Sequence, residues 1–278
     1  MNLTTELLLD GLMFPEAPRW HQNKLWFTDQ HAKQVKTVDL HGNSQLIATL
    51  SDLPGGIGWL PDGRLLVVSM QNRQLLVMEN QELKLYADLS TLASFHCNDL
   101  IVDQSGYAYV GNFGYDLHAG EDISSAEIIL ITPDGKAKVV SNDVIFPNGM
   151  VITTDKKTLI VAETFASRLS SFSIQANGTL SNRKLWASLE NGFPDGICLD
   201  KNNGIWVACP NTGAVLRIEQ GGNVTDTVKP IGSAYACMLG GENLTKLFVL
   251  TSETDDPKLA AQINSGRIEC VNVSVPGI

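Results

Sequence analysis

Hydrophobic and polar residues alternate along this chain in short runs that are separated by polar turns. An apolar stretch, a turn and a second β-rich stretch such as "LWFTD" (25–29) or "GIWVA" (204–208) follow one another, which is the pattern of a hairpin. Further strands follow several hairpins, as in "QVKTVDL" (34–40), with edge segments such as "SQLIATL" (44–50). Sustained helical periodicity is found nowhere. The pattern predicts an all-β fold of short strands.

The hairpins also repeat at blade length. One motif, "FPNGMVIT" at 146–153 and "FPDGICLD" at 193–200, has six copies along the chain, separated by 39 to 50 residues. Such a period predicts a six-bladed β-propeller with four-stranded blades, as a single domain over residues 1–278. A pair of β-sandwiches would give no reason for six copies at this spacing. We expect the leading segment, residues 4–10, to supply the outer strand of the last blade and to close the ring.

The third residue of the motif carries the candidate chemistry, and we call it the key position. In a propeller these positions converge on one rim of the central channel, and they are Glu16, Gly55, Asn98, Asn148, Asp195 and Ala236. One Asp or Asn between Pro and Gly is usually a turn former, but oxygen donors at four equivalent positions favour a site. Two carboxylates and two amide carbonyls suit Ca²⁺, with Mg²⁺, Mn²⁺, Zn²⁺ or Fe²⁺ as alternatives. The sequence therefore predicts a central metal site.

Composition and charge narrow the possible partners. The chain is 44% hydrophobic and 18% charged, and its net charge of −10 argues against binding nucleic acid, which needs clustered Lys and Arg. The amino-terminal stretch has no basic region, and no window approaches a membrane-spanning length, so we expect a cytoplasmic protein that does not bind membranes. The five cysteines are odd in number and form no CxxC pair, which favours buried free thiols in a reducing cytosol.

With these motifs in place, the chain resembles, over nearly its whole length, the family of senescence marker protein (regucalcin), gluconolactonase and related lactonases. The resemblance rests on Glu16 in "EAPRW", Asn148 in "FPNGM", Asp195 in "FPDGI" and the Asn98–Asp99 pair. It implies a six-bladed propeller with one divalent ion in the channel. By this resemblance Glu16, Asn148 and Asp195 bind the metal, and Asn98 completes the metal or substrate shell.

The chain also departs from the family pattern near the expected substrate pocket. Sugar lactonases of the family often have Arg two residues before the asparagine of the "ND" pair, where this chain has His96. We expect substrate contacts from His96, Asn98, Tyr115 and Asp116, and the departure weakens the link to aldonolactones. The long segment 113–126 is predicted to be a lid, with a plain connector as the alternative. Phe14, Phe146, Phe193 and Tyr235 would either wall the pocket or pack between blades.

The predicted function is a metal-dependent lactonase or carboxylic ester hydrolase acting on a small-molecule lactone or ester. The ion polarises the carbonyl, activated water attacks it, and Asp195 is the expected general base. No GxSxG elbow offers a nucleophilic serine. Two alternatives from other classes remain: a non-enzymatic calcium-binding or ligand-sensing propeller, and an interaction scaffold that uses the outer faces of the blades.

Overall fold

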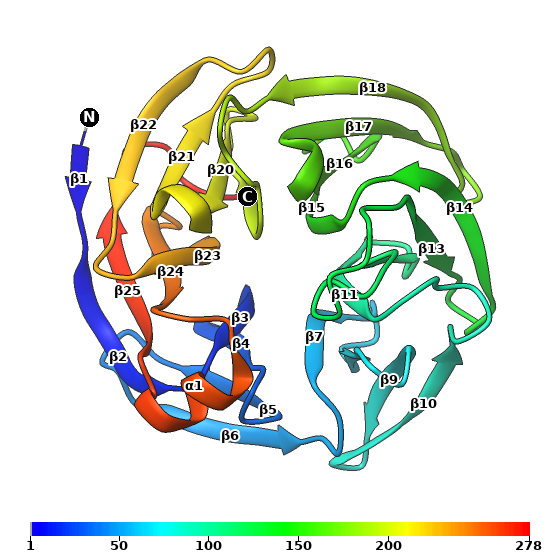
Figure 1. Cartoon of the computed structure of the whole chain (residues 1–278), viewed down its shortest axis with the longest axis horizontal. Helices are drawn as coiled ribbons and strands as arrows, with labels where there is room; N and C mark the ends of the chain where they lie inside the picture. The colour runs from blue at the N-terminus through cyan, green and yellow to red at the C-terminus, as the bar shows by residue number, and fades with distance from the viewer. Residues whose placement is uncertain (1) are drawn as a thin grey trace.

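Six antiparallel sheets surround a central axis in the computed structural model, which describes residues 2–278 (Figure 1). Five of the sheets contain four strands and one contains five, and the innermost strand of every sheet lines the channel. The all-β, six-bladed propeller that the repeat predicts is therefore confirmed. The key positions lie at the start of the innermost strands, so all six meet at the same end of the channel.

The strands of the first three blades follow the chain from the axis outward. They are β3 (Pro15–His21), β4 (Lys24–Asp29), β5 (Gln34–Val38), β6 (Ser44–Thr49), β7 (Pro54–Trp59), β8 (Leu65–Ser69), β9 (Gln74–Glu79), β10 (Glu82–Asp88), β11 (Cys97–Val102), β12 (Ala108–Asn112), β13 (Ala126–Ile131) and β14 (Ala137–Val144). The later blades contain β15 (Pro147–Ile152), β16 (Thr158–Glu163), β17 (Arg168–Ile174), β18 (Leu180–Ser188), β19 (Ile197–Leu199), β20 (Ile205–Cys209), β21 (Ala214–Ile218), β22 (Val224–Lys229), β23 (Ser233–Gly240), β24 (Lys246–Ser252) and β25 (Gly266–Asn272).

The amino-terminal segment closes the ring. Strand β2 (Glu6–Leu12) pairs antiparallel with β25 as the outer strand of blade six, from Glu6 opposite Cys270 to Leu12 opposite Gly266. Strand β1 (Asn2–Thr4) continues the same path and pairs parallel with β22 at the edge of blade five. The predicted closure across the termini is confirmed, with a second contact to the neighbouring blade that the repeat pattern did not predict.

The hydrophobic core is divided into six clusters, each lying between two neighbouring blades. Between blades five and six, for example, Trp206 and Val215 pack with Leu247 and Val249, all nearly inaccessible to solvent. Burying both faces of a sheet in this way explains why the middle strands read as continuous apolar runs. The five cysteines are buried and unpaired, as predicted for small hydrophobes on strands.

Glycines after the key positions allow the inner strands to approach one another at the axis. A Cβ added to Gly149 would lie 2.5 Å from the Ile197 backbone nitrogen, and one on Gly196 would lie 2.6 Å from Ala236 Cβ. Neither glycine has a positive φ, so the requirement is close approach and not backbone conformation. The glycine of the recurring "PxG" is therefore required for the close packing of neighbouring blades.

One short α-helix departs from the purely β expectation. Helix α1 (Pro257–Ile263) lies between β24 and β25, and the Asp256 side chain caps it by accepting hydrogen bonds from the Lys258 and Leu259 amides. A capping Asp followed by Pro at the first helical position is a helix start signal too short for periodicity analysis to detect. Two single 3₁₀ turns, η1 (Thr164–Ala166) and η2 (Pro210–Thr212), follow β16 and β20. Within residues 2–278, no helix has the length and hydrophobicity to cross a membrane.

The close approach of the inner strands gives a first test. We expect Gly149→Ala to destabilise the protein by about 1–3 kcal/mol, because its methyl group would force the backbones of blades four and five apart. Gly192→Ala is the matched control, since its added Cβ would meet only side chains, at 3.3 Å or more. Urea unfolding of both variants measures the difference. Equal stability of the two variants would contradict the packing role of Gly149.

Candidate active site

A cavity of about 440 Å³ occupies the end of the channel where the key positions meet. Glu16 reaches it from β3, Asn98 from β11, Asn148 from β15 and Asp195 from the residue pair before β19. His96 lines the same cavity. The structure therefore brings together the four residues that the sequence predicts as metal ligands, although they are up to 179 positions apart in the chain.

The two carboxylates of this group, Glu16 and Asp195, both have raised pKa values. Burial raises the pKa of Glu16 from 4.5 to about 7, and the nearby Asp99 carboxylate adds to the effect. Burial likewise raises the pKa of Asp195 well above its ordinary value, with repulsion from Glu16 and Asp99 as the next causes. Acidic groups that approach each other in a desolvated place gain most from a cation between them. This end of the channel is therefore suited to a positive ion.

The two asparagines use their amide nitrogens within the protein and leave their amide oxygens free. Asn98 donates from Nδ2 to the Pro147 carbonyl oxygen at 3.3 Å, and a carbonyl can only accept. Asn148 donates from Nδ2 to Thr164 Oγ1 at 3.3 Å, and that hydroxyl donates its own hydrogen to the Pro194 carbonyl at 2.8 Å. These contacts fix which end of each amide is nitrogen and leave Oδ1 as the end that can coordinate a metal.

A cation from the protein already neutralises the third nearby carboxylate. Arg19, three residues after Glu16, contacts Asp99 Oδ1 at 3.0 Å and also donates to the Leu100 carbonyl. Both side chains of the pair are largely buried. With Asp99 paired in this way, Glu16 and Asp195 would together carry a charge of −2 when both are ionised, which matches one divalent ion. Within residues 2–278, no group of three or more His, Cys, Asp or Glu is arranged to hold a metal, so a site here depends on the amide oxygens.

The segments that enter the site are held by polar residues at the far end of the same hairpins. At or just after the end of the second strand of three blades, a side-chain oxygen accepts a hydrogen bond from a backbone N–H that lies just before a key position. The pairs are Asp29 with Phe14 (2.9 Å), Glu163 with Ile145 (2.8 Å) and Asn211 with Phe193 (2.8 Å). The sequence analysis missed these positioning residues. Their signal is the recurrent polar residue that closes the second strand, as in "LWFTD" and "LIVAE".

Two residues beside the key positions have left-handed backbone conformations. Ala17 has φ of 49° and donates its N–H to Glu16 Oε2 at 2.8 Å, while Phe146 has φ of 48° and lies two residues before Asn148. Such conformations cost about 1–3 kcal/mol each and cluster at functional sites. The local strain orients the Glu16 carboxylate and turns the Phe146 ring to the cavity, which it lines.

The predicted substrate contacts are only partly brought together. His96 and Asn98 line the cavity, and so do Leu117 and His118 of the 113–126 loop. Tyr115 and Asp116 are not among the lining residues. The Tyr115 ring is buried and lies 6.0 Å from the Phe146 ring, and Asp116 accepts a hydrogen bond from the Ala119 amide within the loop. The loop therefore contributes to the cavity wall. Tyr115 supports the wall through Phe146, and Asp116 holds the loop's own conformation.

Other residues at the cavity were not predicted. His31 stacks on Phe14 at 4.8 Å, its Nε2 lies 3.0 Å from the Asp255 carbonyl oxygen, and burial lowers its pKa. Asp255 and Pro257 reach the cavity from the segment that begins α1. A single His in a loop gave no sequence signal, because its approach to the axis depends on how blade six folds beside blade one.

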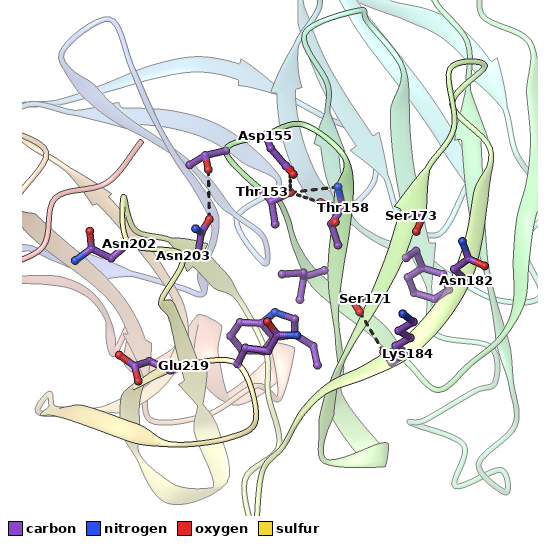
Figure 2. A pocket seen from close by; sticks show the side chains of 15 residues that line it. Thr153, Asp155, Thr158, Ser171, Ser173, Asn182, Lys184, Asn202, Asn203 and Glu219 are labelled. Carbon is purple, nitrogen blue, oxygen red and sulfur yellow. Dashed lines mark hydrogen bonds between the residues drawn. The ribbon is translucent and has the colours of Figure 1, made fainter.

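A larger groove of about 660 Å³ lies elsewhere, between blades four and five (Figure 2). Several of its polar groups are paired with one another: Thr153 Oγ1 donates to Asp155 at 2.6 Å, and Ser171 Oγ donates to the Lys184 carbonyl. They therefore serve turn and strand geometry. The raised pKa values of the central carboxylates make the smaller cavity the better candidate site.

Comparisons with known proteins identify the family. Residues 14–253 match the family model described as the SMP-30/Gluconolactonase/LRE-like region. Regucalcin from Danio rerio is 30% identical over 201 residues, which are 69% of this chain and 67% of that protein. Human regucalcin is 26% identical over 95% of this chain and 92% of its own length.

Solved structures with the same fold include a regucalcin from Agrobacterium tumefaciens, described as a calcium-binding protein. It has a TM-score of 0.84 and 20% identity, and the match covers all of this chain and 97% of that one. A gluconolactonase from Xanthomonas campestris has a TM-score of 0.76 and 20% identity, over 97% of this chain and 89% of its own. At this identity the structural matches establish the fold alone.

The electrostatics of the site predict the pH dependence of the metal-free protein. Glu16 and Asp195 hold protons in the folded state that the unfolded chain has released, so the free energy of unfolding should fall as pH rises from about 5 to about 8. Melting temperatures measured in excess chelator test this. Glu16→Gln removes one of the two titrating groups, so its pH dependence should be weaker than that of the parent. An identical profile in the variant would contradict the raised pKa of Glu16.

Proposed function

Because the chain belongs to the SMP-30/gluconolactonase/LRE-like family, we propose that it is a divalent-metal-dependent hydrolase that opens a lactone ring. The observation that carries the proposal is the convergence of Glu16 and Asp195 on one cavity, where burial, and then repulsion from Glu16, raise the pKa of Asp195. A structural role alone would not need two desolvated carboxylates that oppose each other. A cation between them relieves this repulsion, and the cavity above them has room for a small organic molecule.

The residues present fit a divalent ion. Glu16, Asn148 and Asp195 would hold it directly, and Asn98 directly or through water, which is an all-oxygen set suited to Ca²⁺ with Mg²⁺, Mn²⁺, Zn²⁺ or Fe²⁺ as alternatives. When bound, the ion would polarise the lactone carbonyl and stabilise the negative charge that develops on its oxygen. The fixed amides of Asn98 and Asn148 keep their Oδ1 atoms in place without further ordering.

Asp195 is the proposed general base. A cation beside Asp195 would favour its ionised form, which burial disfavours in the metal-free protein. The side chain is partly open to the cavity, so a water molecule beside it can lose a proton to the carboxylate while the water oxygen bonds to the carbonyl carbon. The ring C–O bond then breaks, and the departing oxygen takes the proton from Asp195. The product is a hydroxy acid, and Asp195 returns to its starting state. His96, whose pKa is lowered by burial, would face the substrate as a neutral imidazole.

The 113–126 loop is proposed to border the bound substrate. Phe113, Leu117 and His118 line the cavity from this loop, which links β12 to β13 without regular structure. Direct substrate contact by Tyr115 and Asp116 remains a prediction that requires the loop to change its conformation. In the observed conformation Tyr115 packs near Phe146, and Asp116 is hydrogen-bonded within the loop.

A second candidate is calcium binding without catalysis, which the description of the Agrobacterium neighbour as a calcium-binding protein favours. The same four oxygens would then serve affinity alone. The two candidates differ in what they require of the cavity, since an ion buffer has no use for a space of about 440 Å³ above the ligands.

A metal titration joined to a substrate screen tests the proposal. We expect Ca²⁺ or another divalent ion to raise the melting temperature of the metal-stripped protein, because the ion binds only the folded state. The same ion should then support acid release from five- or six-membered lactones in a pH-stat. Stabilisation without opening of any lactone or aryl ester would leave the calcium-binding candidate. No stabilisation by any of the five ions would refute the metal site itself.

Substitution of Asp195 separates its role as a base from its role as a ligand. Asp195→Asn keeps the size and one oxygen donor, so we expect kcat at saturating metal to fall by roughly 10² to 10⁴, the usual effect of losing a positioned base. Glu16→Gln should act through metal affinity, so that excess ion restores part of its rate. An Asp195→Asn enzyme as fast as the parent at saturating metal would exclude the general-base role.

A further inference from the structure

One side of the cavity is a continuous aromatic wall, which we define as Phe113, Phe146, Phe165 and Phe193. Their rings touch in sequence: Phe113 stacks on Phe146 at 4.4 Å, Phe165 meets Phe146 edge-on at 4.9 Å, and Phe193 meets Phe165 at 5.7 Å. All four line the cavity and come from blades three, four and five. With Phe14 opposite them, five of the nine phenylalanines in the chain surround this one space.

Such a concentration is more than blade packing requires. The cores between blades are made mainly of aliphatic side chains, and Phe146 is buried where it contacts Phe113. Phe193 lies differently, at the outer end of the wall, and keeps 37% of its surface exposed. An exposed ring that extends a row of buried and half-buried rings to the mouth of a cavity offers apolar surface to a ligand.

Thr164 and Asn211, the polar residues beside Phe165 and Phe193, are already engaged within the protein. The Thr164 hydroxyl donates to the Pro194 carbonyl at 2.8 Å and accepts from Asn148. Asn211 uses both ends of its amide, accepting from the Phe193 amide at 2.8 Å and donating to the Asn191 carbonyl at 2.7 Å. Among the described residues that line the cavity, none is Lys or Arg. Hydroxyl groups on a substrate would therefore lose hydrogen bonds to water at this wall without replacement.

From these contacts we propose that the natural substrate is a lactone that carries an apolar substituent, alkyl or aryl, and that this substituent packs against the aromatic wall. The inference rests on the proposed lactonase function and names the substrate class of that same site. The ester group lies at the floor beside Asp195, and the substituent extends along Phe146 and Phe165 toward Phe193. A polyhydroxylated sugar lactone of the same ring size is disfavoured in this position.

Three lactones with the same six-membered ring make the test direct. These are δ-valerolactone, which has no substituent, δ-decalactone, which carries a pentyl chain, and glucono-δ-lactone, which carries hydroxyl groups. The metal-loaded protein is assayed with each in a pH-stat, after subtraction of spontaneous hydrolysis. We expect kcat/KM for δ-decalactone to exceed that for glucono-δ-lactone by about 10-fold or more, since each buried methylene in a fitted pocket contributes to discrimination.

Variants of the wall identify where the preference arises. Phe165→Ala and Phe193→Ala should each lower kcat/KM for δ-decalactone by about 10-fold, through KM, while δ-valerolactone changes by less than about 2-fold. Leu185→Ala is the control, because Leu185 is an apolar residue with 62% exposure on the outer strand β18, away from the cavity. It should behave as the parent with all three lactones.

The outcomes separate this inference from the function on which it rests. A preference for glucono-δ-lactone, or equal loss with all substrates in the wall variants, would overturn the apolar substrate class and leave the lactonase proposal standing. If none of the three lactones is opened with any of the five divalent ions, the lactonase proposal fails and the substrate class fails with it. A δ-decalactone preference that disappears in Phe165→Ala and Phe193→Ala supports both.

Discussion

The closeness of the inner strands around the axis is the constraint on which the rest of this structure depends. Neighbouring strands meet almost backbone to backbone, so a single added Cβ on Gly149 or Gly196 would overlap the next blade. Because the glycine must sit at that contact, the residue before it must point into the channel. Packing between blades and the direction of the site residues are therefore set by the same few backbone positions.

This geometry has an electrostatic consequence. Residues at equivalent positions of separate blades lie close together at the axis. The carboxylates of Glu16 and Asp195 are therefore buried together, with Asp99 close by. Arg19 reduces part of this repulsion by forming an ion pair with Asp99. What remains is an arrangement whose charge and amide orientations are complementary to a divalent ion, as the proposed function requires. Its stability without a cation should depend on protonation for the same reason.

The cavity above the carboxylates combines two surfaces of different origin. The floor is made of key positions, four of which are polar: Glu16, Asn98, Asn148 and Asp195. The wall joins Phe146 and Phe193, which belong to the repeated motif, to Phe113 and Phe165, which enter from a loop and a 3₁₀ turn. Half of the wall is thus independent of the repeat, so substitutions in the loop and the turn can change the wall without changing the floor.

The sequence alone determined the six blades, the ring closure and the identity of the four oxygen-bearing residues that meet at the end of the channel, because each follows from the repeated strand pattern. It could not determine what the non-repeating segments do. Tyr115 and Asp116 do not line the cavity in the observed conformation, whereas His31 and Asp255 reach it without any local signal. A repeat can be recognised in the sequence because every copy packs against its neighbours in the same way and so keeps the same residue pattern. Loop residues take their places from contacts between blades that lie far apart in sequence, and only the tertiary structure decides those.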